Sequence, residues 1–582
     1  MKKISFKSWI EKIRQVALRF PFVLFFLLGL AFMLFLQINK HGIDIKPNKW
    51  TFFALGIGLS LAVTLFSEEF KNILVKIGLN LLSVLLLLTY CYFLPDKFLP
   101  VHFYQVISVG IALILSAFVV PFFKKNNDIS FWEFSKSSVI QLIVTSVFAN
   151  VLMAGLSLAI LSLNFLFKID VQHEVYQNLA VVCFALFAPV YFLSNITPEN
   201  DMHVQEYTFI KFLKILGLYI LVPILALYSL ILYVYLAQII VKWELPNGWV
   251  STLVSVLGLG GFLAMLILYP LRLKEEKENK IVTLLSMYFP IVLLPLLILM
   301  SVGIFRRLGD YGLTINRLYV MILNVWLYGI CIYLFLSKAN HLKWIIISFT
   351  AVLFLSSVGP WSVYRVTKRA LVKEIGQLLN EAKLMKDGKA VDNSTKTIKV
   401  DGKISDKLSE KIQYLSENFG NKGLQQFFKD SIQDLNGWKI DEKLGIEYES
   451  VFTKHGESKW FNLNVVNNNR QVDLSLYKTM LYLKTNKKSE PVFENKEFRV
   501  TLSDNLIQVF RAKNSKAYIS IDLKSKLRDQ IKLTRNNDFS TCKELIFNSS
   551  DYKLIVNNVS GNYFSKKDSI VIENFEANLL LK

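Results

Sequence analysis

A short segment between two long apolar runs is the strongest candidate for binding chemistry in this sequence. It contains three arginines, an acid and a tyrosine, namely Arg306, Arg307, Asp310, Tyr311 and Arg317. Guanidinium groups bind phosphates and carboxylates through paired hydrogen bonds, so the segment is a candidate site for an anionic headgroup at a membrane edge. The simpler, structural interpretation is that Arg306 and Arg307 extend towards lipid headgroups while Asp310 pairs with Arg317.

Two further clusters of polar and aromatic residues also follow long apolar runs. The first holds Lys242 and Glu244 beside Trp243 and Trp249, and we place Lys242 and Glu244 among the candidate ligand-binding residues. The second is the Gly-Pro-Trp tripeptide at 359–361. Tryptophans at membrane interfaces commonly act as anchors, and glycine and proline commonly form turns, so a structural role is the simpler interpretation of both clusters.

The elements that must position these clusters are apolar runs of membrane-spanning length. A helix needs about 20 apolar residues to cross the hydrocarbon core. Eleven runs approach or exceed this length, near 21–38, 51–67, 74–94, 103–123, 138–164, 176–196, 209–241, 250–271, 281–304, 317–337 and 343–363. We therefore predict an α-helical polytopic membrane bundle over 20–363. Because each crossing changes sides, the three clusters are expected on one face of the membrane.

The basic residues are interpreted as a topology signal, and no nucleic-acid partner is expected. The net charge is +21, but no nucleic-acid-binding motif accompanies it. Residues 1–19 form a basic amphipathic segment that we expect to lie on the membrane surface. Lysine and arginine are about twice as frequent in the loops that share a side with the N-terminus, which favours a cytoplasmic N-terminus. Eleven crossings then place the tail outside, whereas the basic stretch at 365–373 favours the inside, so the side of the tail stays open. Glu68 and Glu69 are expected to be solvated loop charges.

The last 219 residues differ from the rest in charge and pattern. They contain 38 Lys and Arg and 28 Asp and Glu, and no run of membrane-spanning length. We expect an amphipathic helix and linker over 364–403, followed by a soluble α+β domain over 404–582. Periodicity predicts helices near 404–415, 424–435 and 523–531, a hairpin of 461–465 with 472–476, and strands at 497–503, 505–511, 517–522, 552–557 and 569–580.

The order of motifs in the first part of the chain resembles that of a known bacterial family. Trp-Glu-Leu-Pro-x-Gly-Trp at 243–249 precedes an Arg…Tyr-Gly-x-Thr-x-x-Arg motif that ends at Arg317, then Trp326 and Gly-Pro-Trp. This order is similar to that of multi-pass membrane proteins grouped as domain of unknown function 4153, over roughly the first 385 residues. The family pattern has an aromatic residue directly after the second arginine, where this chain has Leu318 and then Tyr319. The resemblance implies an inner-membrane protein and supplies no established reaction.

The motifs that are missing favour a non-catalytic function. The sequence contains no Walker loop, nucleophile elbow, zinc-protease helix or kinase motif, and it implies no cofactor. We expect an envelope scaffold or sensor in the bacterial cytoplasmic membrane, whose 404–582 domain binds a protein partner and whose bundle contacts lipids. One alternative is a carrier of a lipid or anionic amphiphile gripped by the arginines at 306–317. A third is a membrane transferase that uses Asp310 or Glu244 as a base.

Overall fold

The computed structural model of the chain contains two compact units, which are considered one at a time. The first unit comprises Met1–Gln377, Asp387–Ala390 and Lys411–Gly437, and the second comprises Leu378–Lys386, Val391–Glu410 and Trp438–Lys582. The structure describes residues 6–39, 46–123, 128–168, 171–202, 211–242, 249–272, 279–386, 388–391, 402–432, 435, 437–445, 458–465, 475–485, 492–495, 497–503, 505–511, 517–533, 539–542, 545–564 and 569–582.

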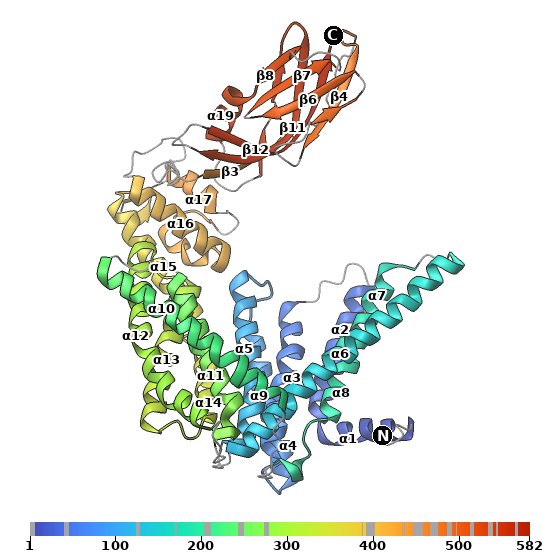
Figure 1. Ribbon diagram of the computed structural model, residues 1–582, viewed down its shortest axis with the longest axis vertical. Helices are drawn as coiled ribbons and strands as arrows, with labels where there is room; N and C mark the ends of the chain where they lie inside the picture. The colour runs from blue at the N-terminus through green and yellow to red at the C-terminus, as the bar shows by residue number, and fades with distance from the viewer. Residues whose placement is uncertain are drawn as a thin grey trace. The chain divides into compact units, whose positions relative to one another are not determined.

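Long apolar helices make up most of the first unit (Figure 1). The unbroken ones are α2 (Pro21–Asn39), α3 (Pro47–Ser67), α4 (Ile73–Tyr92), α5 (Pro100–Val119), α6 (Asp128–Phe167), α11 (Trp249–Arg272), α12 (Asn279–Tyr311) and α13 (Ile315–Leu336). Each of two further crossings consists of two helices joined by a π-helical segment. One crossing joins α7 (His173–Ala180) to α8 (Ala188–Ser194), and the other joins α9 (Lys211–Lys214) to α10 (Val222–Lys242). The last apolar helix of the bundle, α14 (Lys343–Ser357), has 15 residues and is shorter than these crossings.

The predicted polytopic bundle is confirmed. Ten helices in the described part are long and apolar enough to cross a membrane, and α14 is a shorter apolar helix after them. Buried side chains such as Phe262, Leu293 and Leu327 form a core between α11, α12 and α13. Apolar side chains on the outside of the bundle, such as Leu85 and Ile231, remain exposed. An apolar exterior is expected for a surface that faces hydrocarbon, so the chain is a multi-pass membrane protein.

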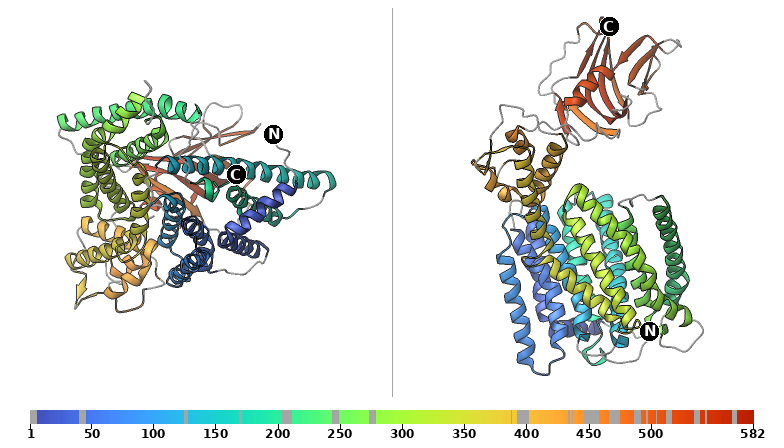
Figure 2. Two further views of the ribbon diagram at one scale, coloured as in Figure 1. Left: turned by 90° about the horizontal axis from the view of Figure 1, so that it is seen from below. Right: turned by 90° about the vertical axis from the view of Figure 1, so that its left-hand side faces the viewer.

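The two ends of the bundle carry different elements (Figures 1 and 2). The amphipathic helix α1 (Phe6–Arg19) lies at one end, together with the turn between α13 and α14, and we call this end the N-terminal face. Helix α15 (Val363–Glu381) begins at the opposite end, next to the turn between α12 and α13, and we call that end the C-terminal face. The bundle therefore begins on the N-terminal face and ends on the C-terminal face.

The second unit is an α+β domain with two sheets, as predicted. The larger sheet has the order β4-β12-β11-β3-β9, with β10 also paired to β11, and the smaller sheet has the order β5-β6-β7-β8. All pairs are antiparallel except β3 with β9. The main strands are β3 (Ser458–Val465), β4 (Thr479–Thr485), β6 (Phe498–Ser503), β7 (Leu506–Arg511), β8 (Ile519–Asp522), β11 (Tyr552–Phe564) and β12 (Ser569–Leu581). The shorter elements are β5 (Phe493–Glu494), β9 (Phe539–Cys542), β10 (Ile546–Asn548), α17 (Gly437–Leu444) and α19 (Lys524–Leu533). Helix α16 (Gly402–Phe419) is divided between the units, with Lys411 and the residues after it in the first unit.

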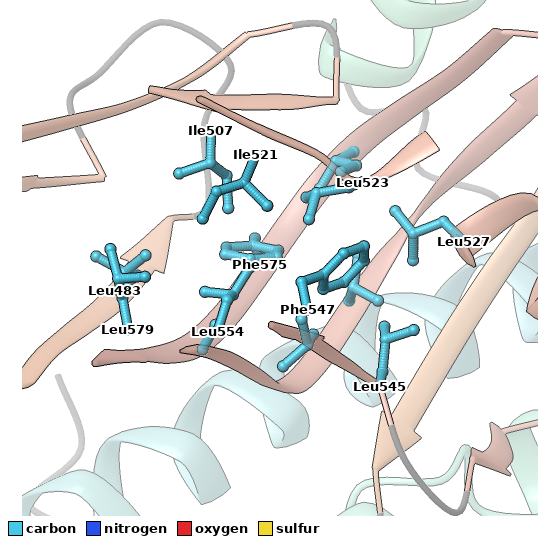
Figure 3. Close-up of a cluster of buried hydrophobic side chains, with 14 of the residues drawn as sticks. Leu483, Ile507, Ile521, Leu523, Leu527, Leu545, Phe547, Leu554, Phe575 and Leu579 are labelled. Carbon is cyan, nitrogen blue, oxygen red and sulfur yellow. The ribbon is translucent and has the colours of Figure 1, made fainter. Parts of the chain in front are cut away.

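An apolar core lies between the two sheets (Figure 3). Leu483 and Phe575 come from the larger sheet, and Ile507 and Ile521 from the smaller one. Leu527 of α19 extends the same core. Alternate residues of each strand enter this core, so the other residues of the larger sheet form a second face that points away from it.

Two local predictions for the tail are wrong. The segment 461–465 does not form a hairpin with 472–476 but lies in β3, which pairs with β11 and β9; residues 466–474 lie outside the described part. The predicted helix at 424–435 is replaced by short 3-10 turns at Asn421–Gly423 and Gln425–Phe427. The amide of Asn421 donates to the carbonyl of Ile432 at 2.8 Å, which folds the segment back on itself.

Candidate functional site

The arginine-rich segment occupies the C-terminal face of the bundle. Arg306 and Arg307 lie near the end of α12, and both side chains are exposed. Asp310 and Tyr311 are the last residues of the same helix, and their side chains lie outside the described part. The structure therefore brings two of the predicted cations to the membrane edge.

The two described residues of the cluster at 242–249 lie on the same face. Lys242 is the last residue of α10 and is exposed, whereas Glu244 belongs to 243–248, which lie outside the described residues. Trp249 begins α11 and is 75% exposed, as an interfacial anchor would be. The Ser255 hydroxyl donates to Met300 Sδ at 3.9 Å, which places the start of α11 beside the end of α12.

The turn between α12 and α13 is built around a glycine. Gly312 has a φ of +74°, a left-handed conformation that disfavours any side chain. Arg317 donates from Nη1 to the Gly312 carbonyl at 2.7 Å. The Thr314 hydroxyl caps α13 by accepting a hydrogen bond from the Arg317 N–H. Arg317 is thus held by the turn, which is a structural role for one of the predicted ligand-binding residues.

Side chains of α15 and α16 pack directly on this turn. Lys411 and Glu374 form an ion pair that lies so close to Gly312 that a Cβ there would overlap it. Tyr414 accepts a hydrogen bond from the Ile315 N–H at 3.2 Å. Burial raises the pKa of Tyr414, so its phenol stays protonated. These contacts make the arginine-rich segment at 306–317 the place where the bundle meets the helices that follow it.

A network of hydroxyl groups lies behind the turn. The Tyr319 and Tyr364 hydroxyls are 2.8 Å apart, and Ser108 lies 3.0 Å from Tyr364 and 3.3 Å from Tyr319. Ser357, at the end of α14, is also 3.3 Å from Tyr319. Tyr319 is the residue displaced by one position from the family pattern, and its role here is to connect α13 to α5, α14 and α15.

Tyr364 also lines a pocket of about 370 Å³ on the C-terminal face, which we call the basic pocket. Its cations are Arg365 and Lys368 of α15, and its neutral polar groups include His102 and Gln105 of α5. Its apolar lining includes Phe93, Leu94, Val101, Val358 and Phe419. The basic pocket therefore offers hydrogen-bond donors and positive charge beside apolar surface.

Among the described residues that line the basic pocket, two are cationic and none is acidic. Burial, and next the nearby ammonium of Lys422, lower the pKa of Lys368. An anion that binds beside such a lysine stabilises the charged form of its side chain. His102 accepts the Leu99 N–H on Nδ1 at 3.0 Å, which leaves Nε2 as the donor nitrogen of the neutral ring. The electrostatics of the pocket favour a negatively charged group.

The Gly-Pro-Trp cluster contributes its glycine to one edge of the basic pocket. Gly359 lines the pocket and has a φ of +91°, which lets the chain turn between α14 and α15. A Cβ at Gly359 would lie 3.1 Å from the Trp361 ring, so the ring covers the glycine. Trp361 is 61% exposed. The turn-and-anchor interpretation thus describes this cluster, and the same turn also shapes a cavity.

A second cavity, which we call the apolar cavity, lies among the membrane-spanning helices. Its volume is about 400 Å³, and it is lined by residues of α2, α3, α5, α6 and α8 such as Leu27, Leu61, Phe118 and Phe192. The hydroxyl of Thr145 is buried at its wall without a hydrogen-bond partner among the described residues. Its lining has the chemistry of a hydrocarbon-binding site.

A buried ion pair that was not predicted from the sequence lies on the N-terminal face. Glu68 is not a solvated loop charge: its side chain is 7% exposed and binds Arg19 through contacts of 2.7 and 3.0 Å. Arg19 also donates to the Thr197 carbonyl at 2.9 Å, so it joins α1, α3 and the end of α8. The spacing of Arg19 and Glu68 in the sequence gives no signal of this contact.

A second polar cluster on the N-terminal face was also missed. Asp128, at the start of α6, accepts a hydrogen bond from Tyr269 at 3.2 Å and lies 2.9 Å from His341 Nδ1. Lys343 is almost fully buried beside it, with Nζ 3.3 Å from the Phe122 carbonyl. His341 therefore has a carboxylate partner, although the sequence presents it as an isolated loop residue.

Comparison with known proteins places the membrane unit in a family. The sequence profile described as "Domain of unknown function (DUF4153)" matches residues 17–375. An uncharacterised protein of Pasteurella multocida (strain Pm70), PM1469, is 24% identical over 286 residues. The match covers 49% of this chain, and the chain spans only 48% of that relative. No solved structure matches the chain.

Proposed function

We propose that this protein, which belongs to the family designated domain of unknown function (DUF4153), binds an anionic amphiphile in the bacterial cytoplasmic membrane. The observation that supports this proposal is that Arg365 and Lys368 line one pocket together with apolar side chains at the C-terminal face of the bundle. A headgroup with a phosphate or carboxylate matches the two cations. The hydrocarbon part of the same molecule matches the apolar walls and the surrounding bilayer.

The arginines of the 306–317 segment take a supporting role in this proposal. Arg306 and Arg307 are exposed on the face that holds the basic pocket, and Lys242 is exposed at the end of α10. Positive charge around an opening raises the local concentration of anionic ligands. Direct contact with the headgroup is assigned to Arg365 and Lys368, which line the cavity itself.

Binding of a lysophospholipid pair tests the proposal. The full chain in detergent would be titrated with oleoyl lysophosphatidic acid and with oleoyl lysophosphatidylcholine, and bound lipid counted by native mass spectrometry. We expect Arg365→Gln with Lys368→Gln to weaken binding of the anionic lipid by at least about tenfold, because two charge-assisted hydrogen bonds are lost. Binding of the zwitterionic lipid should change little.

A matched control keeps this test specific. Lys373 lies on the same helix, is exposed and does not line the basic pocket. Lys373→Gln should leave binding of the anionic lipid unchanged. Equal affinity in the double variant and the parent protein, or an equal loss in Lys373→Gln, would reject the assignment of the headgroup to the basic pocket.

A second candidate function is a non-catalytic scaffold or sensor that binds a protein through its tail. One observation favours it: the second unit has an apolar core of its own between its two sheets. Crosslinking in cells should then recover a partner that is lost when residues 446–582 are deleted. Recovery of the same proteins with and without these residues would count against this role. The transferase interpretation is not tested by the structure, because Glu244 and the Asp310 side chain lie outside the described part.

A further inference from the structure

The larger sheet of the second unit has one face that is unusually rich in asparagine. The register of the strands places the following residues on the face that points away from the apolar core: Asn462 and Asn464 of β3, Asn558 and Asn562 of β11, and Asn574 and Asn578 of β12. Ser560, Glu576 and Lys484 lie among them. We call this surface the asparagine face.

The polar residues of the asparagine face lie side by side across four strands. Asn464 is opposite Asn558, which is opposite Glu576, which is opposite Lys484. A neighbouring row joins Asn462, Ser560 and Asn574 in the same way. Residues of the intervening rows, such as Leu463, Val559 and Phe575, belong to the core. The strand alternation thus gathers the amides into one continuous surface.

The asparagine face contains a cavity of about 350 Å³. Asn462, Lys484, Asn558, Ser560, Asn574 and Glu576 line it. Ser560 is only 4% exposed and accepts a hydrogen bond from Asn574 Nδ2 at 3.0 Å. The Oδ1 atoms of Asn462 and Asn558 are buried and have no hydrogen-bond partner among the described residues. A buried acceptor without a partner is costly, so these two oxygens favour a ligand that donates hydrogen bonds.

Folding alone does not account for this composition. Asparagine is depleted in strands, where threonine or a β-branched apolar residue is more favourable. The core on the other face already provides the apolar burial that holds the sheet in register. A cluster of asparagines that disfavours the strands is therefore better explained by a binding function of the outer face.

The chemistry of the asparagine face selects among ligand classes. Each carboxamide provides two donors and an acceptor, which match the hydroxyl groups of a sugar. The cavity holds one lysine and one acid, so its formal charge is balanced and does not favour a phosphate or a carboxylate. Tyr482 donates a hydrogen bond to Glu576 at the rim and is 48% exposed, which leaves an aromatic surface for stacking on a sugar ring.

We propose that the asparagine face binds a neutral glycan. The cavity holds one or two sugar units, and the asparagines of β3, β11 and β12 exchange hydrogen bonds with their hydroxyl groups. This inference is independent of the basic pocket, which lies wholly in the first unit. Either proposal can therefore fail while the other stands.

Binding of defined oligosaccharides to the full chain in nanodiscs tests this inference. The probes are maltotetraose, cellotetraose and chitotetraose, with a sulfated heparin tetrasaccharide and a neutral twelve-residue peptide as comparisons. We expect at least one neutral tetrasaccharide to bind and to lose about tenfold in affinity in Asn558→Ala with Asn574→Ala. Loss of several hydrogen bonds from two side chains corresponds to a change of this size.

One control variant and one further test variant separate binding from folding. Asn548→Ala changes an exposed asparagine of β10 on the same face of the sheet but outside the cavity, and it should bind as the parent does. Asn574→Asp is the second test of the site. It removes the amide that donates to Ser560 but keeps the size and length of the side chain. Absence of binding by all three neutral probes, binding only of the sulfated probe or the peptide, or equal losses in Asn548→Ala would overturn the proposal.

Discussion

At the scale of single residues, Gly312 holds the most constrained position on the C-terminal face. Its φ of +74° and the adjoining Lys411–Glu374 pair both exclude a side chain. We expect Gly312→Ala to destabilise the protein by about 1–3 kcal/mol, because the strain and the overlap act together. Thermal unfolding in detergent measures the change as a lower Tm.

Gly309 provides the matched control three residues away. It lies within α12, and a Cβ built there has no neighbour within 4 Å. Alanine is a better helix former than glycine by about 1 kcal/mol, so Gly309→Ala should keep or raise the Tm. If both alanine variants lowered the Tm equally, the turn would not be the constrained point that its geometry indicates.

Lys368 gives the basic pocket a pH dependence whose sign can be worked out. Burial lowers the pKa of its ammonium below the usual lysine value, so in the empty pocket the charge is lost at a lower pH than for an exposed lysine. A bound anion favours the charged form and raises that pKa again. The affinity for oleoyl lysophosphatidic acid should therefore be highest at neutral pH and fall as the pH rises through the pKa of the empty pocket.

The Lys368→Arg variant distinguishes this lysine from other titrating groups. A guanidinium stays charged throughout the alkaline range, so the decline in affinity between pH 7 and pH 10 should flatten in the variant. Native mass spectrometry or fluorescence titration at each pH measures the affinity. A decline that is identical in both proteins would assign the pH dependence to another group.

At the scale of elements, the Arg19–Glu68 pair fixes the amphipathic helix α1 to the bundle. The two side chains are 22% and 7% exposed, and their contact is bidentate. Removal of one partner leaves a largely buried charge, so Glu68→Gln should destabilise the protein by about 1–3 kcal/mol. A double-mutant cycle with Arg19→Gln, followed by thermal unfolding, measures the coupling between the two side chains.

The Lys46–Asp96 pair is the control for this cycle. Its contact is 2.8 Å, but its side chains are 56% and 62% exposed. Exposed ion pairs contribute about 0–1 kcal/mol, so the coupling of Lys46 with Asp96 should be clearly smaller than that of Arg19 with Glu68. Similar coupling in both cycles would contradict the structural role assigned to Glu68.

The elements that sequence reasoning recovered are those with local signals. The long apolar runs predicted the membrane helices, and the alternation at 497–503 and 505–511 predicted β6 and β7, which pair with each other. The partner of β3 was not recoverable in this way. Its neighbours β11 and β9 lie many residues further along the chain, and the register between them depends on burial in the common core.

The candidate site was likewise predictable only where the sequence carries a local signal. The described residues of the three motif clusters lie at one end of the bundle, as the number of crossings predicted. The basic pocket was not predictable, because His102 and Gln105 reach it from α5 and the cations from α15. The spacing of these residues along the chain carries no information about their contact, which only the packing of the helices creates.

At the scale of the whole molecule, two charge signals favour one side of the membrane for ends of the bundle that lie on opposite faces. The basic residues of α1 favour a cytoplasmic N-terminus, and the basic stretch at 365–373 favours the same side for the end of the bundle. Yet α1 and the start of α15 lie on opposite faces of the first unit (Figure 1). Arg365 and Lys368 line the basic pocket, and in the function proposed above their positive charge serves ligand binding and does not determine topology.

We therefore expect the two termini to lie on opposite sides of the membrane, with the N-terminus in the cytoplasm. Reporter fusions in cells at Met1 and at Lys582, using a fluorescent protein that is active only in the cytoplasm and a phosphatase that is active only outside it, measure this directly. The variant Arg365→Gln with Lys368→Gln should leave both readings unchanged if these cations serve the pocket. A tail that reports from the cytoplasm would instead mean that the short helix α14 does not complete a crossing, and that the positive charges after it determine the topology.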